Sequence, residues 1–274
     1  MNAPLLVKAA REGRSIVSVT PESAGWRFVG FEALRLEDGD QYRGDTGGRE
    51  LCLVVVAGHI AVTSGELSWN DLGNRASPFE DAAPYAVYLP PGRSLLIEAI
   101  GAAEVALCWA PAVKGVAPRL IEPETMQRTV RGQGSNTRYV RDILPQTEPA
   151  EALLVVEVIT PAGNSSSYPP HKHDTDALPV ESSLEETYYH RLDPPQGFVF
   201  QRVYTDDRSI DEAMAVEDRD VVMVPRGYHP VVAPHGYTSY YLNVMAGPRR
   251  LWHFHNDPAH EWMLTPGAIR PRPA

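Results

Sequence analysis

Glycine and proline interrupt this sequence so often that the chain has no room for a long helix. Of its 274 residues, 21 are glycine and 25 are proline. Many short strands joined by turns are typical of an all-β sandwich or barrel, with at most short helices at Glu122–Arg128 and Ile210–Val216. The β-branched and aromatic runs between the breaks are the expected strands: Leu51–Ala57, Tyr85–Leu89, Ser94–Ala99, Glu104–Trp109, Leu153–Thr160, Glu186–His190, Phe198–Thr205, Val221–Val224 and Tyr237–Met245.

The chain repeats one pattern in two halves. A cluster of strands precedes the turn Leu89-Pro-Pro-Gly92 in the first half and Val224-Pro-Arg-Gly227 in the second, and more strands follow each turn. We therefore expect an N-terminal barrel over residues 1–112, a connector over 113–150 and a C-terminal barrel over 151–274. The connector is rich in arginines, which we expect either to be solvated or in inter-domain ion pairs, or to face a substrate: Arg128, Arg131, Arg138 and Arg141.

The charge balance argues against two classes of partner. The chain carries 25 lysines and arginines against 35 aspartates and glutamates, a net charge of −10. Nucleic acids and anionic membranes select basic surfaces, so we expect binding to neither. No apolar run approaches a membrane span, and Met1–Gly13 lacks the apolar core of a signal peptide. We expect a cytoplasmic protein whose Cys52 and Cys108 are buried thiols, although a bridge between them stays open.

The most informative segment contains two histidines, His171 and His173, two residues apart. If this stretch is extended, both imidazoles leave the same face of the strand. Glu186 begins another expected strand, and His229 directly follows a tight turn. Histidine pairs of this kind are half of a metal site, and the carboxylate and the late histidine could complete it. The alternative is that the histidines merely line a polar turn.

The order His-x-His, Glu and a distant Pro-x-Gly-x-His resembles the two signature motifs of the cupin superfamily, whose members are small antiparallel β-barrels. Three imidazoles and one carboxylate suit one divalent transition metal, such as zinc, manganese or iron. The spacing before the glutamate is longer than is usual in cupins, so Glu185 is an alternative ligand. The ligands that the resemblance implies are His171, His173, Glu186 and His229.

The first half lacks these ligands. Arg43–Glu50 occupies the place of the His-x-His motif, and no histidine follows Pro90-Pro-Gly92. We therefore expect a bicupin, two stacked barrels, with a metal only in the C-terminal one. The N-terminal barrel would then serve packing or dimerisation, and a homo-oligomer is expected from base rates.

Longer strings go beyond a generic cupin and resemble the 5-deoxy-glucuronate isomerases of bacterial myo-inositol catabolism. The resemblance is densest over residues 160–262. It implies interconversion of 5-deoxy-D-glucuronate and 5-dehydro-2-deoxy-D-gluconate, a small sugar-acid substrate, a metal ion and no organic cofactor. The strings include Ser167-Tyr-Pro-Pro-His-Lys-His-Asp174, Leu184-Glu-Glu-Thr-Tyr-Tyr-His-Arg191, Val224-Pro-Arg-Gly-Tyr-His-Pro230 and Trp252-His-Phe-His-Asn-Asp257.

An aldose–ketose isomerase must move a proton or a hydride between neighbouring carbons. Alternation along the strand places His190 beside Glu186, so His190 is the expected proton-transfer group of an enediol route. A bound hydroxide is the rival base, and a hydride shift would need none. A uronate ketol-isomerase, an iron dioxygenase or a sugar-binding cupin without activity are the alternative functions.

The carboxylate of the substrate needs a cation or hydroxyl donors. Arg202 lies in an otherwise apolar strand and is the first candidate, although an outward arginine or a structural ion pair is equally compatible with the sequence. Tyr188 and Tyr241 are the candidate hydroxyl donors. Strand alternation allows only one of Tyr240 and Tyr241 to point into the barrel.

Overall fold

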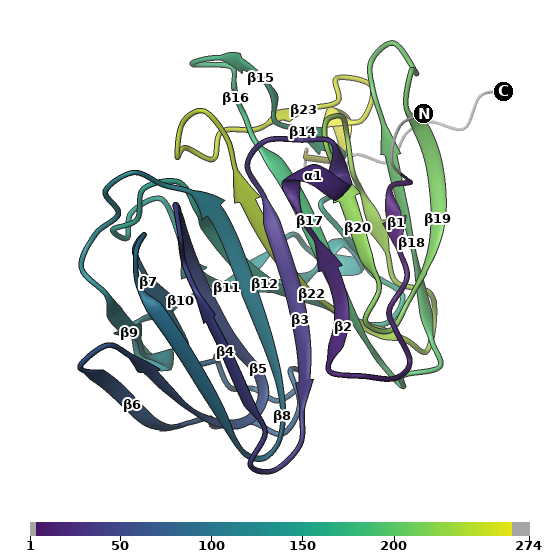
Figure 1. Ribbon diagram of the computed structural model, residues 1–274. Helices are drawn as coiled ribbons and strands as arrows, with labels where there is room; N and C mark the ends of the chain where they lie inside the picture. The colour runs from purple at the N-terminus through teal and green to yellow at the C-terminus, as the bar shows by residue number, and fades with distance from the viewer. Residues whose placement is uncertain (1–3, 265–274) are drawn as a thin grey trace, which may run out of the picture.

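The protein is built almost entirely from antiparallel strands, as Figure 1 shows for the computed structural model, which describes residues 4–264. The all-β prediction is confirmed. The helical segments in this range are too short to cross a bilayer. They are α1 (Pro21–Ala24) and the 3-10 turns Pro123–Thr125, Gly134–Asn136 and Glu261–Leu264.

The N-terminal half forms an eight-stranded sheet in the order β2-β3-β8-β5-β7-β9, with β4 beside β8 and β6 beside β5. The long strand β8 joins the two expected strands Ser94–Ala99 and Glu104–Trp109 into one. The strands are β2 (Ser15–Val19), β3 (Gly30–Leu36), β4 (Gln41–Asp45), β5 (Arg49–Ser64), β6 (Leu67–Leu72), β7 (Ala86–Leu89), β8 (Ser94–Pro111) and β9 (Arg119–Ile121).

The C-terminal half consists of a seven-stranded sheet, β1-β20-β17-β22-β12-β11-β10, and a four-stranded sheet, β13-β21-β18-β19. The first contains β1 (Leu6–Val7), β10 (Gln127–Arg131), β11 (Arg138–Leu144), β12 (Leu154–Thr160), β17 (Glu185–Asp193), β20 (Val221–Val224) and β22 (Thr238–Ala246). The second contains β13 (Ser165–Ser166), β18 (Phe198–Tyr204), β19 (Asp211–Glu217) and β21 (Val231–Val232). Two short pairs join β14 (His171–Lys172) to β23 (His255–Asn256) and β15 (Asp174–Ala177) to β16 (Glu181–Ser183).

One expected helix is a strand. The prediction of helical turns at Ile210–Val216 was wrong, because β19 occupies this stretch and pairs with β18 along its whole length. Met214 and Val216 are buried while their neighbours in the strand are exposed. This alternation with a period of two is that of a strand with one face on the core.

Strand pairing carries chain segments across the expected domain boundaries. β1, at the N-terminus, pairs with β20, with Leu6 opposite Val222. β10 and β11, which come from the expected connector, belong to the large C-terminal sheet. The division into residues 1–112, 113–150 and 151–274 stays a prediction.

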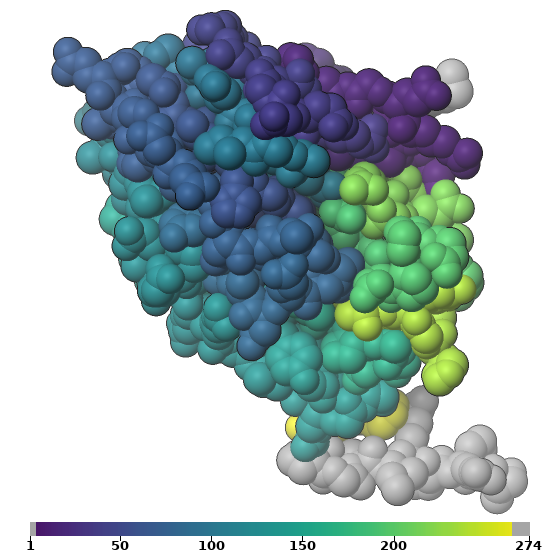
Figure 2. Space-filling model, turned by 90° about the horizontal axis from the view of Figure 1, so that it is seen from below, coloured from purple at the N-terminus to yellow at the C-terminus, as the bar shows by residue number. Residues whose placement is uncertain are grey.

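Each half encloses its own apolar core, and a third core lies where the two large sheets pack. Leu51, Leu53 and Val55 of β5 point into the N-terminal core, whereas the alternate residues of β5 point toward the C-terminal half. Cys52 and Cys108, opposite each other on β5 and β8, are buried free thiols. Figure 2 shows that the purple and blue N-terminal half and the green C-terminal half meet along a continuous boundary.

A buried ion-pair cluster joins the two halves. Arg75, from the N-terminal half, donates to both carboxylate oxygens of Glu157 at 2.9 Å. Arg141 of β11 donates to the same carboxylate at 2.9 Å. All three side chains are almost inaccessible to solvent. Buried charges of this kind need mutual pairing because each is costly to desolvate alone.

Candidate metal centre

Three histidines meet in the C-terminal barrel. His171 lies in β14, His173 follows that strand directly, and His229 lies after the turn that ends β20. One ring nitrogen from each lies within 4.8 Å of those of the other two. The sequence prediction that these residues come together is therefore met by the fold. Among the histidine, cysteine, aspartate and glutamate side chains of residues 4–264, these three histidines are the group that lies close enough together to hold a metal ion.

Glu186, on β17, lies beside two of these histidines. Its Oε2 lies 3.1 Å from Nε2 of His173 and 3.3 Å from Nε2 of His229. On the other side of each ring, Nδ1 of His173 faces the Leu184 carbonyl at 3.2 Å and Nδ1 of His229 faces the Gly227 carbonyl at 2.8 Å. A carbonyl only accepts, so both Nδ1 atoms carry a hydrogen. The Nε2 lone pair of neutral His229 then points toward the cluster, whereas Nε2 of His173 donates to Glu186 when its ring is protonated.

The adjacent Glu185 points the opposite way. Its carboxylate accepts hydrogen bonds from the backbone N–H groups of Arg27 and Phe28, both at 2.7 Å, and of Val29 at 3.1 Å. Strand alternation forces this division, because consecutive side chains leave opposite faces of β17. Glu185 therefore anchors a loop of the N-terminal half, and Glu186 faces the histidines.

Burial keeps most of the cluster neutral. Desolvation lowers the pKa of His171 well below its usual value and lowers that of His229 to about 4. His173 differs: although burial opposes protonation, its hydrogen bond to Glu186 raises its pKa. Neutral imidazoles are the form that binds a metal ion.

Two predicted tyrosines line the cavity beside the cluster. The rings of Tyr188 and Tyr241 lie 5.0 Å apart, and the Tyr188 hydroxyl is 3.1 Å from Oγ of Ser167. Burial raises the pKa of Tyr188 well above its usual value, so its hydroxyl stays protonated at neutral pH. Tyr240 points away, toward Arg75 at the interface between the halves, as alternation requires.

His190 lies deeper in the barrel, behind the two tyrosines. It is fully buried, and its Nε2 lies 2.9 Å from Oε1 of Gln201. Its ring is 6.0 Å from that of Tyr188 and 5.7 Å from that of Tyr241. Burial lowers its pKa to about 4. His190 does not line the cavity, whereas Tyr188 and Tyr241 do.

Arg202 is not brought to the site. The inward residues of β18 are Val199, Gln201 and Val203, and the guanidinium of Arg202 is exposed and paired with Asp211 at 2.7 and 2.9 Å. The expectation that Arg202 faces the substrate is therefore corrected. Its side chain lies on the outer face of the sheet, where it pairs with Asp211 of β19. The sequence identified the strand but not which of its faces is inside.

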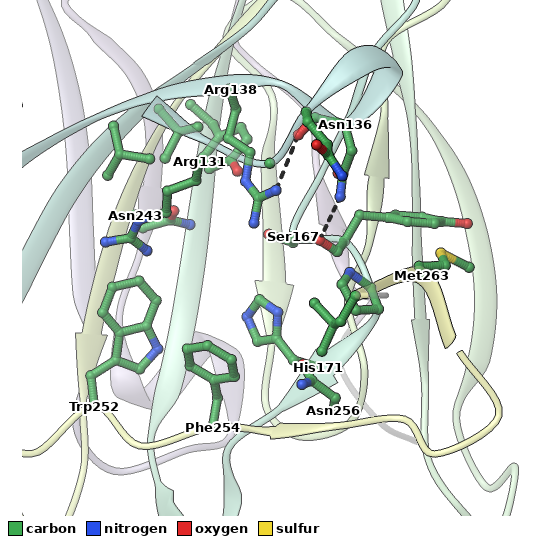
Figure 3. A pocket seen from close by; sticks show the side chains of 18 of the residues that line it. Arg131, Asn136, Arg138, Ser167, His171, Asn243, Trp252, Phe254, Asn256 and Met263 are labelled. Carbon is green, nitrogen blue, oxygen red and sulfur yellow. Dashed lines mark hydrogen bonds between the residues drawn. The ribbon is translucent and has the colours of Figure 1, made fainter. Parts of the chain in front are cut away.

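The cavity beside the histidines has a volume of about 530 Å³. Figure 3 shows Arg131 and Arg138 on one side, His171 opposite, and Trp252 and Phe254 closing a further side. The two arginines were noted in the sequence without a decision between an inter-domain and a substrate-facing role. The aromatic wall was missed, because its place depends on β23 pairing with β14.

Comparison with known proteins decides the family. The profile of the KduI/IolB family matches residues 5–263. The chain belongs to the KduI/IolB family. The sequence-based recognition is thereby confirmed.

Relatives in this family carry a consistent name. A protein of Geobacillus kaustophilus named 5-deoxy-glucuronate isomerase is 54% identical over 254 residues, covering 92% of each chain. A protein of the same name from Bacillus subtilis strain 168 is 55% identical over 247 residues, covering 90% of this chain and 91% of the relative.

Solved structures confirm the cupin architecture. The crystal structure of an IolB-like protein from Salmonella typhimurium matches with a TM-score of 0.94 and 48% identity, covering 96% of this chain and all of that one. An oxalate decarboxylase of Lactobacillus farciminis matches with a TM-score of 0.65 at 12% identity, covering 97% and 92% of the two chains. The latter likeness concerns the fold alone.

Proposed function

We propose that this KduI/IolB family member is a 5-deoxy-glucuronate isomerase, converting 5-deoxy-D-glucuronate to 5-dehydro-2-deoxy-D-gluconate with one divalent metal ion. The observation that carries the proposal is identity above 50% over about nine-tenths of the chain to proteins of that name. The cavity supports it, because one potential metal ligand, His171, lies across the same space from the cationic side chains of Arg131 and Arg138.

We propose His171, His173, Glu186 and His229 as the metal ligands. Oε2 of Glu186 lies 3.1 Å from Nε2 of His173 and 3.3 Å from Nε2 of His229, so that one bound ion could contact all three atoms. Nε2 of His229 is buried without a hydrogen-bond partner, as a metal-binding nitrogen would be. A bound divalent ion would polarise the carbonyl and stabilise developing negative charge on the substrate oxygens. Zinc, manganese and iron all suit this ligand set.

The surrounding side chains orient the substrate. Tyr188 and Tyr241 keep their protons at neutral pH, so their hydroxyls can donate to substrate oxygens. The aromatic side chains of Trp252 and Phe254 form part of the cavity wall. His190, held by Gln201, positions the two tyrosine rings, and its direct role in proton transfer stays a prediction.

We also propose that the metal is confined to the C-terminal barrel. The interior of the N-terminal barrel is filled by aliphatic side chains such as Leu53, Val105 and Leu107. Its role is then to pack against the C-terminal half or to form a homo-oligomer.

The test is conversion of 5-deoxy-D-glucuronate by the purified, metal-loaded protein, followed by nuclear magnetic resonance with and without oxygen. We expect the ketose acid to form equally in both, with no oxygen consumed. Oxygen uptake coupled to substrate loss would instead indicate a dioxygenase, and binding without conversion a sugar-binding module. In deuterium oxide, deuterium on the former aldehyde carbon would support an enediol route, and its complete absence a hydride shift or a shielded base.

A further inference from the structure

Arg138, at the start of β11, extends its guanidinium into the cavity, as Figure 3 shows. One of its nitrogens donates to the backbone carbonyl of Asn136 at 3.1 Å. Within residues 4–264 no carboxylate lies within ion-pair distance of it. A partly buried guanidinium with most of its donors free is costly unless something negative joins it.

The other arginines of this segment already have partners. Arg141 is buried against Glu157, and Arg128 pairs with Asp81 at the surface. Arg131 lies over the Trp252 ring at 5.5 Å and reaches Asp142 at 3.9 Å. Of the four arginines between residues 128 and 141, Arg138 is thus the one that has no carboxylate partner within residues 4–264.

The turn before β11 holds Arg138 in place. The side-chain amide of Asn136 donates to the Tyr168 carbonyl at 3.0 Å, which ties the turn to the loop that carries His171. Gly132 begins the turn with φ +74°, and a Cβ there would approach the Asn136 carbonyl oxygen to 2.0 Å. The guanidinium is therefore presented by a fixed backbone, which favours a positioned ligand over a mobile surface charge.

We propose that Arg138 binds the carboxylate of the sugar acid and selects acids over neutral sugars; this inference rests on the proposed function. Arg138 and His171 line the same cavity. The substrate carries its reacting carbons and its carboxylate at opposite ends of the carbon chain. With the reacting end at the histidines, the carboxylate meets the guanidinium, which matches it as a two-pronged donor.

The experiment compares 5-deoxy-D-glucuronate with 5-deoxy-D-glucose, a neutral sugar with the same aldehyde end, in wild type, Arg138→Gln and Arg138→Lys. We expect the acid-to-neutral ratio of kcat/KM to fall about 30-fold or more in Arg138→Gln and less in Arg138→Lys. Arg128→Gln, outside the cavity, is the matched control and keeps the ratio. Equal losses on both substrates, an unchanged ratio, or loss of the ratio in Arg131→Gln alone would overturn the inference.

A binding measurement separates this inference from the proposed function. Calorimetric titration of the purified proteins with D-gluconate is expected to show binding by wild type and Arg128→Gln and at least about tenfold weaker binding by Arg138→Gln. Metal content and melting temperature equal to wild type would show that the variant is folded. If wild type binds gluconate through Arg138 but isomerises nothing, the proposed function fails and the carboxylate site stands. Equal binding by wild type and Arg138→Gln, or none by wild type, refutes the carboxylate site.

Discussion

Two neighbouring glutamates of β17 have opposite tasks, and the difference is set by the direction in which each side chain leaves the strand. Glu186 faces His173 and His229, whereas Glu185 accepts three backbone hydrogen bonds from the N-terminal half. The sequence could not choose between them, because the choice depends on how β17 pairs with β20 and β22.

Glu186→Gln is expected to lose most of the metal bound by wild type, since a neutral amide replaces the anionic ligand. Glu185→Gln is expected to keep the metal but to lower the free energy of unfolding by about 1.5–3 kcal/mol, because charge-assisted hydrogen bonds to the loop are weakened. Elemental analysis and denaturant unfolding measure the two effects. Metal loss in Glu185→Gln with retention in Glu186→Gln would show that the ligand assignment is reversed.

His190 makes the stability of the metal-free protein depend on pH. Its pKa is about 4 when folded and about 6.5 when unfolded, so the unfolded chain binds the extra proton between these values. The groups facing it are Gln201, Asp220, Tyr188 and Tyr241. Neutral His190 contributes up to about 3 kcal/mol to the free energy of unfolding. This contribution is complete above pH 6.5 and is lost as the pH falls toward 4.

His190→Gln removes this titration. We expect the free energy of unfolding of the variant to fall less steeply than that of wild type between pH 6.5 and 4.5. Urea unfolding at several pH values, both proteins stripped of metal, gives the two slopes. Identical slopes would mean that His190 does not stay neutral in the folded barrel.

Among the elements, the turn after β20 positions His229. Gly227 ends the turn after β20 with φ +94°, and a Cβ there would lie 2.5 Å from the Tyr204 carbonyl oxygen. Its N–H also donates to Asp174 at 2.8 Å. This turn therefore fixes where His229 lies relative to His171, His173 and Glu186.

Gly227→Ala is expected to weaken metal binding, because the backbone must move to relieve the contact and His229 moves with it. The strain should also cost about 1–3 kcal/mol of stability. Gly236→Ala is the matched control: φ is +89°, but no atom lies within 4 Å of the added Cβ. Metal affinity measured by competition with a chelator should fall in the first variant alone; an equal fall in both would remove the close contact as the cause.

The sequence predicts elements better than the faces they bury. His171 and His173 could be placed on one face from their spacing alone, and the all-β fold followed from the turns. The error at Arg202 arose because alternation defines two faces without saying which is covered. The role of Arg138 was undecided because β11 joins the C-terminal sheet through pairing with β12, a contact that no local pattern encodes.

At the scale of the molecule, the two halves are joined by charge as well as by the shared apolar core. Arg75 is the residue of the N-terminal half that pairs with Glu157 in the buried cluster. It also donates to the Val56 and Ala82 carbonyls at 2.9 Å. Removing it leaves Glu157 with Arg141 alone and two carbonyls without a donor.

Arg75→Met is expected to lower the free energy of unfolding by about 3–5 kcal/mol, the usual cost of breaking a buried ion pair. Arg128→Met, which removes an exposed pair with Asp81, should cost less than about 1 kcal/mol. Denaturant unfolding compares the two. Similar small losses would show that the cluster contributes little to joining the halves.

We propose that one metal ion, in the C-terminal barrel, makes this chain an isomerase of 5-deoxy-D-glucuronate. The most direct test titrates metal-stripped protein with zinc, manganese or iron while measuring conversion of this substrate. We expect no conversion without metal, a rise in proportion to the metal added and a plateau at about one ion per chain, with His171→Ala remaining inactive. Full activity of the stripped protein, or no conversion by protein carrying one ion per chain, would contradict it.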